Sequence, residues 1–122
     1  MNEIDVFKLA CKLGFDVRGA QLNNNLNSLI IVNENCDIIP GFNSNKVIAY
    51  NCKKDINIKR NSVGILLNEY ITAKSEQDNV YMANTNEDSN PIIDINLLAL
   101  KCFQKGFIKR KKDIKRLYKK MY

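Results

Sequence analysis

The chain of 122 residues contains no histidine and no tryptophan. Without histidine it lacks the most common zinc ligand of proteases and the most common general base near neutral pH. No apolar run approaches the roughly 18 residues that a membrane-spanning helix requires. The acidic start at residues 2–5 does not resemble a secretion signal. These absences predict a cytoplasmic protein with no membrane segment, no bound metal and no cofactor.

The four cysteines, Cys11, Cys36, Cys52 and Cys102, form no Cys-x-x-Cys pair. Zinc knots are built on such pairs, so the spacing predicts no metal cluster. We expect free thiols that are largely buried or inert. The alternative is a disulfide between Cys36 and Cys52, which requires an oxidising compartment.

Hydrophobic spacing predicts one small α+β domain. Val6, Leu9, Ala10 and Leu13 recur with the period of a helix, which Asn2 would cap and Gly14 would end. Residues 29–32 and 47–50 are β-rich runs on either side of a Pro-Gly turn at residues 40–41. We therefore expect a short sheet of about three strands, packed by this N-terminal helix and by helices that follow.

Three further helices are expected after the sheet. The central one carries an apolar stripe, whereas residues 72–90 are polar and are predicted to form a long surface loop in which only residues 80–82 can pair as a strand. A third helix follows Pro91, and Gly106 separates it from a fourth. The expected stripe of the central helix is Val63, Leu66, Leu67, Tyr70 and Ile71, and that of the fourth helix is Ile114, Leu117, Tyr118 and Met121.

Residues 58–71 resemble the active helix of the ImmA/IrrE family of zinc metallopeptidases, laid without gaps on the family segment K-R-F-T-I-A-H-E-L-A-H-Y-I. The ends of the segment match at residues 59–60 and 70–71, and Leu67 matches within it. Ser62, Val63 and Gly64 replace a threonine, an isoleucine and an alanine of the family. The two histidine positions fall on Ile65 and Glu69, and the position of the catalytic glutamate falls on Leu66.

The resemblance covers about residues 4–103. It includes a helix ending in Lys-Leu-Gly-Phe at residues 12–15, a short strand after it, and a loop like that of residues 39–42. The third metal ligand of the family corresponds to Asp94. The resemblance thus implies a pseudopeptidase domain at residues 1–104 that keeps the fold and has lost its metal site and its hydrolytic activity.

The vestigial metal positions Ile65, Leu66, Glu69 and Asp94 also have structural interpretations. Apolar packing at Ile65 and Leu66 would fill a site that holds no metal. Glu69 and Asp94 could meet and hold a hard cation, or could be solvated or ion-paired side chains. Asp94 would equally suit the start of a helix, where an acid interacts with the helix dipole.

Positive charge is concentrated near the C-terminus. Residues 1–100 carry 9 basic and 12 acidic side chains, whereas residues 101–122 carry 10 basic and one acidic. We expect residues 105–122 to form a basic amphipathic helix packed on the same domain. Its basic surface would be a solvated face, a contact for nucleic acid or nucleoprotein, or a membrane-surface helix, although the missing tryptophan disfavours a membrane. This surface comprises Lys109, Arg110, Lys111, Lys112, Lys115, Arg116, Lys119 and Lys120.

The family resemblance implies a protein carried by a phage or mobile element. Its active members act on helix-turn-helix repressors, so a member without metal would bind a protein partner stoichiometrically. The partner would be such a repressor, or a host defence nucleoprotein such as a CRISPR effector, so that the protein would be an anti-repressor or an anti-CRISPR inhibitor. The alternative function is that of a nucleic-acid-binding accessory protein acting through the basic surface.

Overall fold

The computed structural model describes residues 3–33, 38–73, 79–86 and 90–118. It confirms an α+β fold, with a four-stranded sheet in place of the expected three strands or so. No helix among the described residues is long and apolar enough to cross a membrane. In sequence order the elements are α1 (Val6–Lys12), β1 (Asp16–Ala20), β2 (Leu26–Asn33), β3 (Lys46–Asn51), α2 (Ile56–Thr72), β4 (Asn79–Thr85), α3 (Ile95–Gln104) and α4 (Lys111–Lys115).

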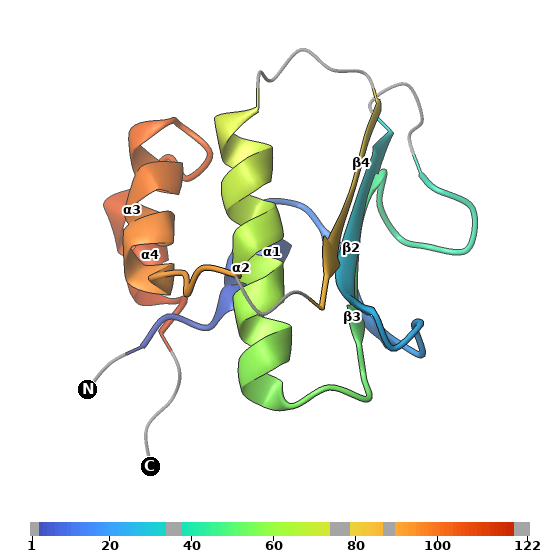
Figure 1. Cartoon of the computed structure of the whole chain (residues 1–122). Helices are drawn as coiled ribbons and strands as arrows, with labels where there is room; N and C mark the ends of the chain where they lie inside the picture. The colour runs from blue at the N-terminus through green and yellow to red at the C-terminus, as the bar shows by residue number, and fades with distance from the viewer. Residues whose placement is uncertain (1–2, 34–37, 74–78, 87–89, 119–122) are drawn as a thin grey trace.

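The sheet is mixed and has the strand order β1-β3-β2-β4. β2 pairs antiparallel with both β3 and β4, and β1 pairs parallel with β3. Ile30, Val32 and Ile48 lie in the buried core, which also contains α2 residues. Figure 1 shows α2 standing between the sheet and α3, so the molecule has a sheet layer, a central helix and an outer helical layer.

The prediction of a long surface loop at residues 72–90 is wrong for most of the residues that the structure describes there. β4 extends over seven of them and pairs along the length of β2. Met82 lies opposite Ile30, and Val80 lies opposite Val32. Tyr81, between them, is 66% exposed. Only Val80 and Met82 of this strand pack on the core, and their neighbours are mostly polar. Two alternating apolar residues are too few to identify a strand without knowledge of its partner.

The first helix begins later than expected. Asp5 is its N-cap and accepts hydrogen bonds from the backbone N–H groups of Phe7 (2.9 Å) and Lys8 (3.4 Å). Asn2, the expected cap, lies outside the described residues. Gly14 has a φ of +95°, which confirms the expected left-handed residue just past the helix end.

The central helix is covered on more than one side. Residues 62–67 are all buried, six in succession, whereas a helix that packs on one layer buries only a stripe. The second cover comes from the start of α3. A Cβ atom on Gly64 would lie 2.8 Å from Ile95 Cδ1 and 3.3 Å from Ile93 Cγ2, so any larger residue here would require the Ile95 side chain to shift.

The C-terminal region forms a shorter helix than expected. Within the described residues α4 has only five residues and ends at the C-cap Arg116. Leu117 and Tyr118 then run beside the N-terminal segment, where Asp5 N–H donates to Leu117 O (2.8 Å) and Ile4 forms an isolated antiparallel bridge with Tyr118. This backbone pairing competes with further helical turns, so residues 117–118 form a short extended segment, called the C-terminal strip, that pairs with the N-terminal segment. Met121 lies outside the described residues.

Candidate functional site

The vestigial metal positions do not form a polar site. Leu66 is fully buried and Ile65 is 7% exposed, as expected if apolar packing fills this part of α2. Asp94 is the N-cap of α3 and accepts a hydrogen bond from Leu97 N–H (3.2 Å), so the interpretation as a helix-start acid is confirmed. Glu69 is exposed near the end of α2.

Glu69 and Asp94 are not brought to one point. The residues on either side of Asp94 pack against Gly64, and Glu69 lies five residues further along α2, about 7.5 Å along the helix axis at 1.5 Å per residue. Within the described residues no group of three or more Cys, Asp or Glu side chains is placed to hold a metal ion.

The cysteines differ in their surroundings. Cys102 is buried, and burial raises the pKa of its thiol to about 11. Cys11 and Cys52 are free as expected, but they are exposed and not buried. Burial, together with the nearby charges of Asp5 and Asp16, raises the pKa of Cys11. Neither Cys11 nor Cys102 is therefore an activated nucleophile at neutral pH.

A cleft of about 490 Å³ is lined by residues from the first turns of α2, the end of β4 and the segment leading into α3. Figure 1 shows these three parts of the backbone near one another. None of the vestigial metal positions lines it. Six of its thirteen lining residues are asparagines and four are isoleucines. The lining residues are Glu3, Asn27, Asn57, Ile58, Arg60, Asn61, Ser62, Asn84, Asn86, Asn90, Ile92, Ile93 and Ile95.

An irregularity in β2 directs Asn27 into this cleft. Leu26 pairs with Thr85 and Ser28 with Asn84, so Asn27 has no opposite residue on β4, as in a β-bulge. Asn27 is only 3% exposed. The Asn27 amide donates to Asn84 Oδ1 (3.3 Å) and Thr85 O (3.2 Å), whereas Asn27 Oδ1 accepts no hydrogen bond.

Arg60 enters the cleft from α2. One terminal nitrogen of its guanidinium forms an ion pair with Glu3, and the side chain is only 15% exposed. Arg60 Nε is buried and has no hydrogen-bond partner. The cleft is thus lined by the largely buried cation Arg60 from α2 and by the bulge residue Asn27 from β2. Each of these two side chains has one buried polar atom without a hydrogen-bond partner.

Asn61 fixes the opposite wall of the cleft. Its amide donates to Pro91 O (2.9 Å), and its Oδ1 accepts from Ile93 N–H (2.8 Å). Asn90 in turn donates to Thr85 O (3.0 Å). These side-chain hydrogen bonds hold residues 90–93 against α2 and β4. The backbone of this segment therefore forms one side of the cleft.

The six described members of the basic surface are all exposed, and Lys119 and Lys120 lie outside the described residues. Two of the six, together with Lys12 of α1, contact one buried acid, Asp113: the distances are 3.1 Å from Arg110 Nε, 3.5 Å from Lys12 Nζ and 3.9 Å from Arg116. Burial acts to raise the pKa of Asp113. The hydrogen bonds and charge of Arg110 and the charge of Lys12 outweigh it, so the pKa lies below the usual aspartate value.

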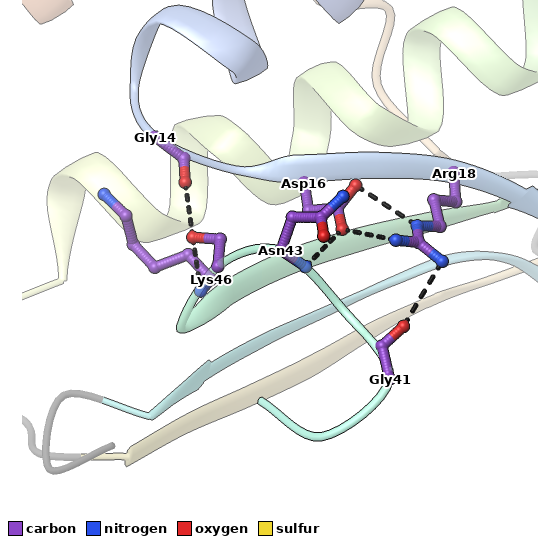
Figure 2. Close-up of polar contacts among 7 residues, drawn as sticks. Gly14, Asp16, Arg18, Gly41, Asn43 and Lys46 are labelled. Atoms are coloured by element: carbon purple, nitrogen blue, oxygen red, sulfur yellow. Dashed lines mark hydrogen bonds and ion pairs between the residues drawn. The ribbon is translucent and has the colours of Figure 1, made fainter. Parts of the chain in front are cut away.

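A second acid anchors the loop that the resemblance predicted after β2. Figure 2 shows Asp16 of β1 accepting from Asn43 N–H (2.9 Å) and from Arg18 Nε (3.2 Å), while Arg18 donates to Gly41 O (3.3 Å). The Asn43 hydrogen bond and then the Arg18 hydrogen bond lower the pKa of Asp16. This network fixes the 39–44 loop on the edge strand, and we assign it a structural role.

Comparison with known proteins gives no match to any family model, curated protein or solved structure. The resemblance to the ImmA/IrrE family therefore remains a prediction from the motif residues.

The cleft residues were not predicted from the sequence. No local sequence pattern indicates a β-bulge at Asn27. The clearest available indication was Arg60, a charged residue directly before the apolar stripe of α2. Its burial depends on Glu3, 57 positions away in the sequence.

Proposed function

We propose that this protein is a non-catalytic, ImmA/IrrE-like binding protein that acts stoichiometrically on a protein partner. The observation that carries the proposal is the distribution of exposed apolar side chains. Among the described residues seven large hydrophobic side chains are exposed, and five of them fall at the start of α2 and between residues 92 and 100, with Ile92 the most exposed of these at 92%. These five are Ile56, Ile58, Ile92, Leu97 and Leu100.

Exposed aliphatic groups concentrated in two neighbouring segments are typical of protein–protein interfaces. The buried Ile65 and Leu66 support a role without catalysis, because a metal peptidase needs polar ligands at these positions. The partners that the family resemblance implies are a helix-turn-helix repressor or a defence nucleoprotein such as a CRISPR effector.

The basic surface supports a second candidate function, direct binding of nucleic acid. Its six described cations face solvent, and the only acid among them, Asp113, is already paired. About six phosphate contacts would make affinity fall by about 10³ between 50 and 200 mM salt, largely independent of sequence. A protein complex with an apolar centre would lose association rate and keep most of its stability.

The test is capture of partners from the native host by the intact protein, with and without nuclease, followed by measurement of stoichiometry for the purified pair. We expect a 1:1 or symmetric complex that survives nuclease and 200 mM salt and that contains no cleaved partner and no stoichiometric zinc. Leu97→Asp with Leu100→Asp should abolish capture. A variant with four charge reversals should slow association without abolishing capture. Its substitutions are Lys111→Glu, Lys112→Glu, Lys115→Glu and Arg116→Glu.

A different result would favour nucleic-acid binding over the leading proposal. In that case nuclease and the four Glu substitutions would each abolish capture, and the two leucine substitutions would leave it intact.

A further inference from the structure

Two residues that line the cleft at the N-terminal end of α2 each bury one polar atom, and the two atoms have opposite hydrogen-bonding requirements. Asn27 Oδ1 is an acceptor without a donor, and Arg60 Nε–H is a donor without an acceptor. The orientation of the Asn27 amide is fixed, because its nitrogen faces the backbone carbonyl of Thr85 at 3.2 Å. Buried polar groups are almost always satisfied in folded proteins, so a ligand that supplies one donor and one acceptor would complete this site.

The charge of the cleft selects a neutral ligand. Among the described residues that line it, only Glu3 and Arg60 are charged, and they form an ion pair with each other. A phosphate or carboxylate would have to compete with Glu3 for the guanidinium. No aromatic side chain lies among the described lining residues, so these offer a nucleobase no ring on which to stack.

The remaining surface of the cleft combines amides with aliphatic side chains. Asparagine amides carry the same donor and acceptor groups as a peptide bond and pair with it readily. Ile58 of α2 and Ile92 of the segment before α3 both line the cleft, are 40% and 92% exposed, and offer apolar contact to a ligand side chain. The volume of about 490 Å³ lies within the range of ligand pockets and admits a few residues.

We infer that this cleft binds an uncharged, extended peptide segment of the protein partner. A backbone N–H of the segment donates to Asn27 Oδ1, a backbone carbonyl oxygen accepts from Arg60 Nε, and an apolar side chain packs against Ile58 and Ile92. The inference rests on the proposed function, since it names the part of the partner that the protein recognises. It places recognition at the bulge of β2 and away from the vestigial metal positions.

The probe is N-acetyl-leucine N-methylamide, titrated into the intact protein and followed by the backbone amide signals in NMR. Its matched control is the ester analogue in which both peptide N–H groups are replaced by oxygen. We expect shift changes centred on Asn27, Arg60 and Asn84. The ester should bind about tenfold more weakly, because it leaves Asn27 Oδ1 without a donor.

Variants test the same contacts. Asn27→Ala should reduce peptide affinity about tenfold, whereas Asn24→Ala, at an exposed asparagine outside the cleft, should leave it unchanged. Since Asn27→Ala also removes the bonds to Asn84 and Thr85, Ile92→Ser serves as a second variant. Ile92 is too exposed for its loss to unfold the protein, and we expect weaker peptide binding from the lost apolar contact.

Equal binding of peptide and ester, shifts outside the cleft, or no shifts up to the solubility limit would each overturn the inference. The last result would mean that the cleft holds water only. If a protein partner is captured but the Asn27 variant captures it equally well, only the cleft assignment fails. If the peptide binds and no partner forms a stoichiometric complex, only the proposed function fails.

Discussion

The two ends of the layer between α2 and the sheet are both buried, yet they are built from different chemistry. At one end Ile30 and Val32 of β2 lie in the apolar core with Leu66 and Leu67 of α2. At the other end the same face of β2 reaches Ser28, which is fully buried and whose hydroxyl has no partner. The interior changes from apolar to polar within two residues of one strand.

The apolar end of this layer stabilises the fold, whereas the polar end contains groups that lower its stability. A buried polar atom without a partner costs about 1–3 kcal/mol. The polar end contains three such atoms, Asn27 Oδ1, Ser28 Oγ and Arg60 Nε, and these are the only ones among the described side chains. Local departures of this kind are expected where a protein binds something.

The largest effect is expected from breaking the apolar end. Leu67→Ala should lower the free energy of unfolding by about 2–5 kcal/mol, because it leaves a cavity at a fully buried position. Leu100→Ala, at an exposed position of the same residue type, should change it by less than about 0.5 kcal/mol. Urea denaturation measures both, and similar losses would mean that α2 is not the centre of the core.

A polar group placed into the apolar end should cost less than a cavity but still be clear. Ile65→His introduces an imidazole into a nearly buried site and should destabilise the protein by about 1–3 kcal/mol. It should not restore zinc binding, because Leu66 and Glu69 do not complete the ligand set. Thermal melts and elemental analysis measure the two outcomes. Unchanged stability would show that the vestigial site is open to solvent.

At the polar end a substitution should have the opposite sign. Ser28→Ala removes a buried hydroxyl that has no partner and should raise the free energy of unfolding by about 1 kcal/mol. Ser62→Ala is the control, since the Ser62 hydroxyl donates to Lys59 O at 2.9 Å. A loss of stability in Ser28→Ala would indicate an ordered water bound to the hydroxyl and weaken the contrast between the two ends.

Asp113 provides a satisfied buried acid for comparison, and the effect there should be the smallest because its cationic partners are exposed to solvent. Its folded pKa lies below the unfolded value of about 4. Its stabilising contribution is therefore full above that value and is lost as pH falls through the folded pKa. Melting temperatures of wild type and Asp113→Asn should differ at pH 6 and converge as the pH falls through the folded pKa of Asp113.

Local patterns predicted the parts of the fold that depend on neighbouring residues. The stripe of α2, the left-handed Gly14 and the helix-start role of Asp94 are all set within one or two helical turns, and each is confirmed. The expected roles of the basic surface and of the vestigial positions in binding stay predictions. At the vestigial positions the sequence predicted buried Ile65 and Leu66 correctly.

Features that depend on distant pairing could not be predicted in the same way. β4 is stabilised by its register with β2, roughly 50 residues earlier in the sequence. The bulge that buries Asn27 exists only because Leu26 and Ser28 pair with consecutive residues of β4. The C-terminal strip ends its helix because Asp5, over 100 residues away, bonds to Leu117. Each outcome follows from tertiary contacts that override local propensity.

The bridge between Ile4 and Tyr118 also sets the order in which a newly synthesised protein completes its fold. Ile4 is made first and is 1% exposed in the finished structure, yet residues 117 and 118, with which its segment pairs, leave the ribosome much later. Until then the sheet and α2 can associate while the site beside Ile4 stays open. Final closure of the domain therefore waits until residues 117 and 118 have left the ribosome, and a nascent polypeptide stalled before residue 117 would present that apolar site to chaperones.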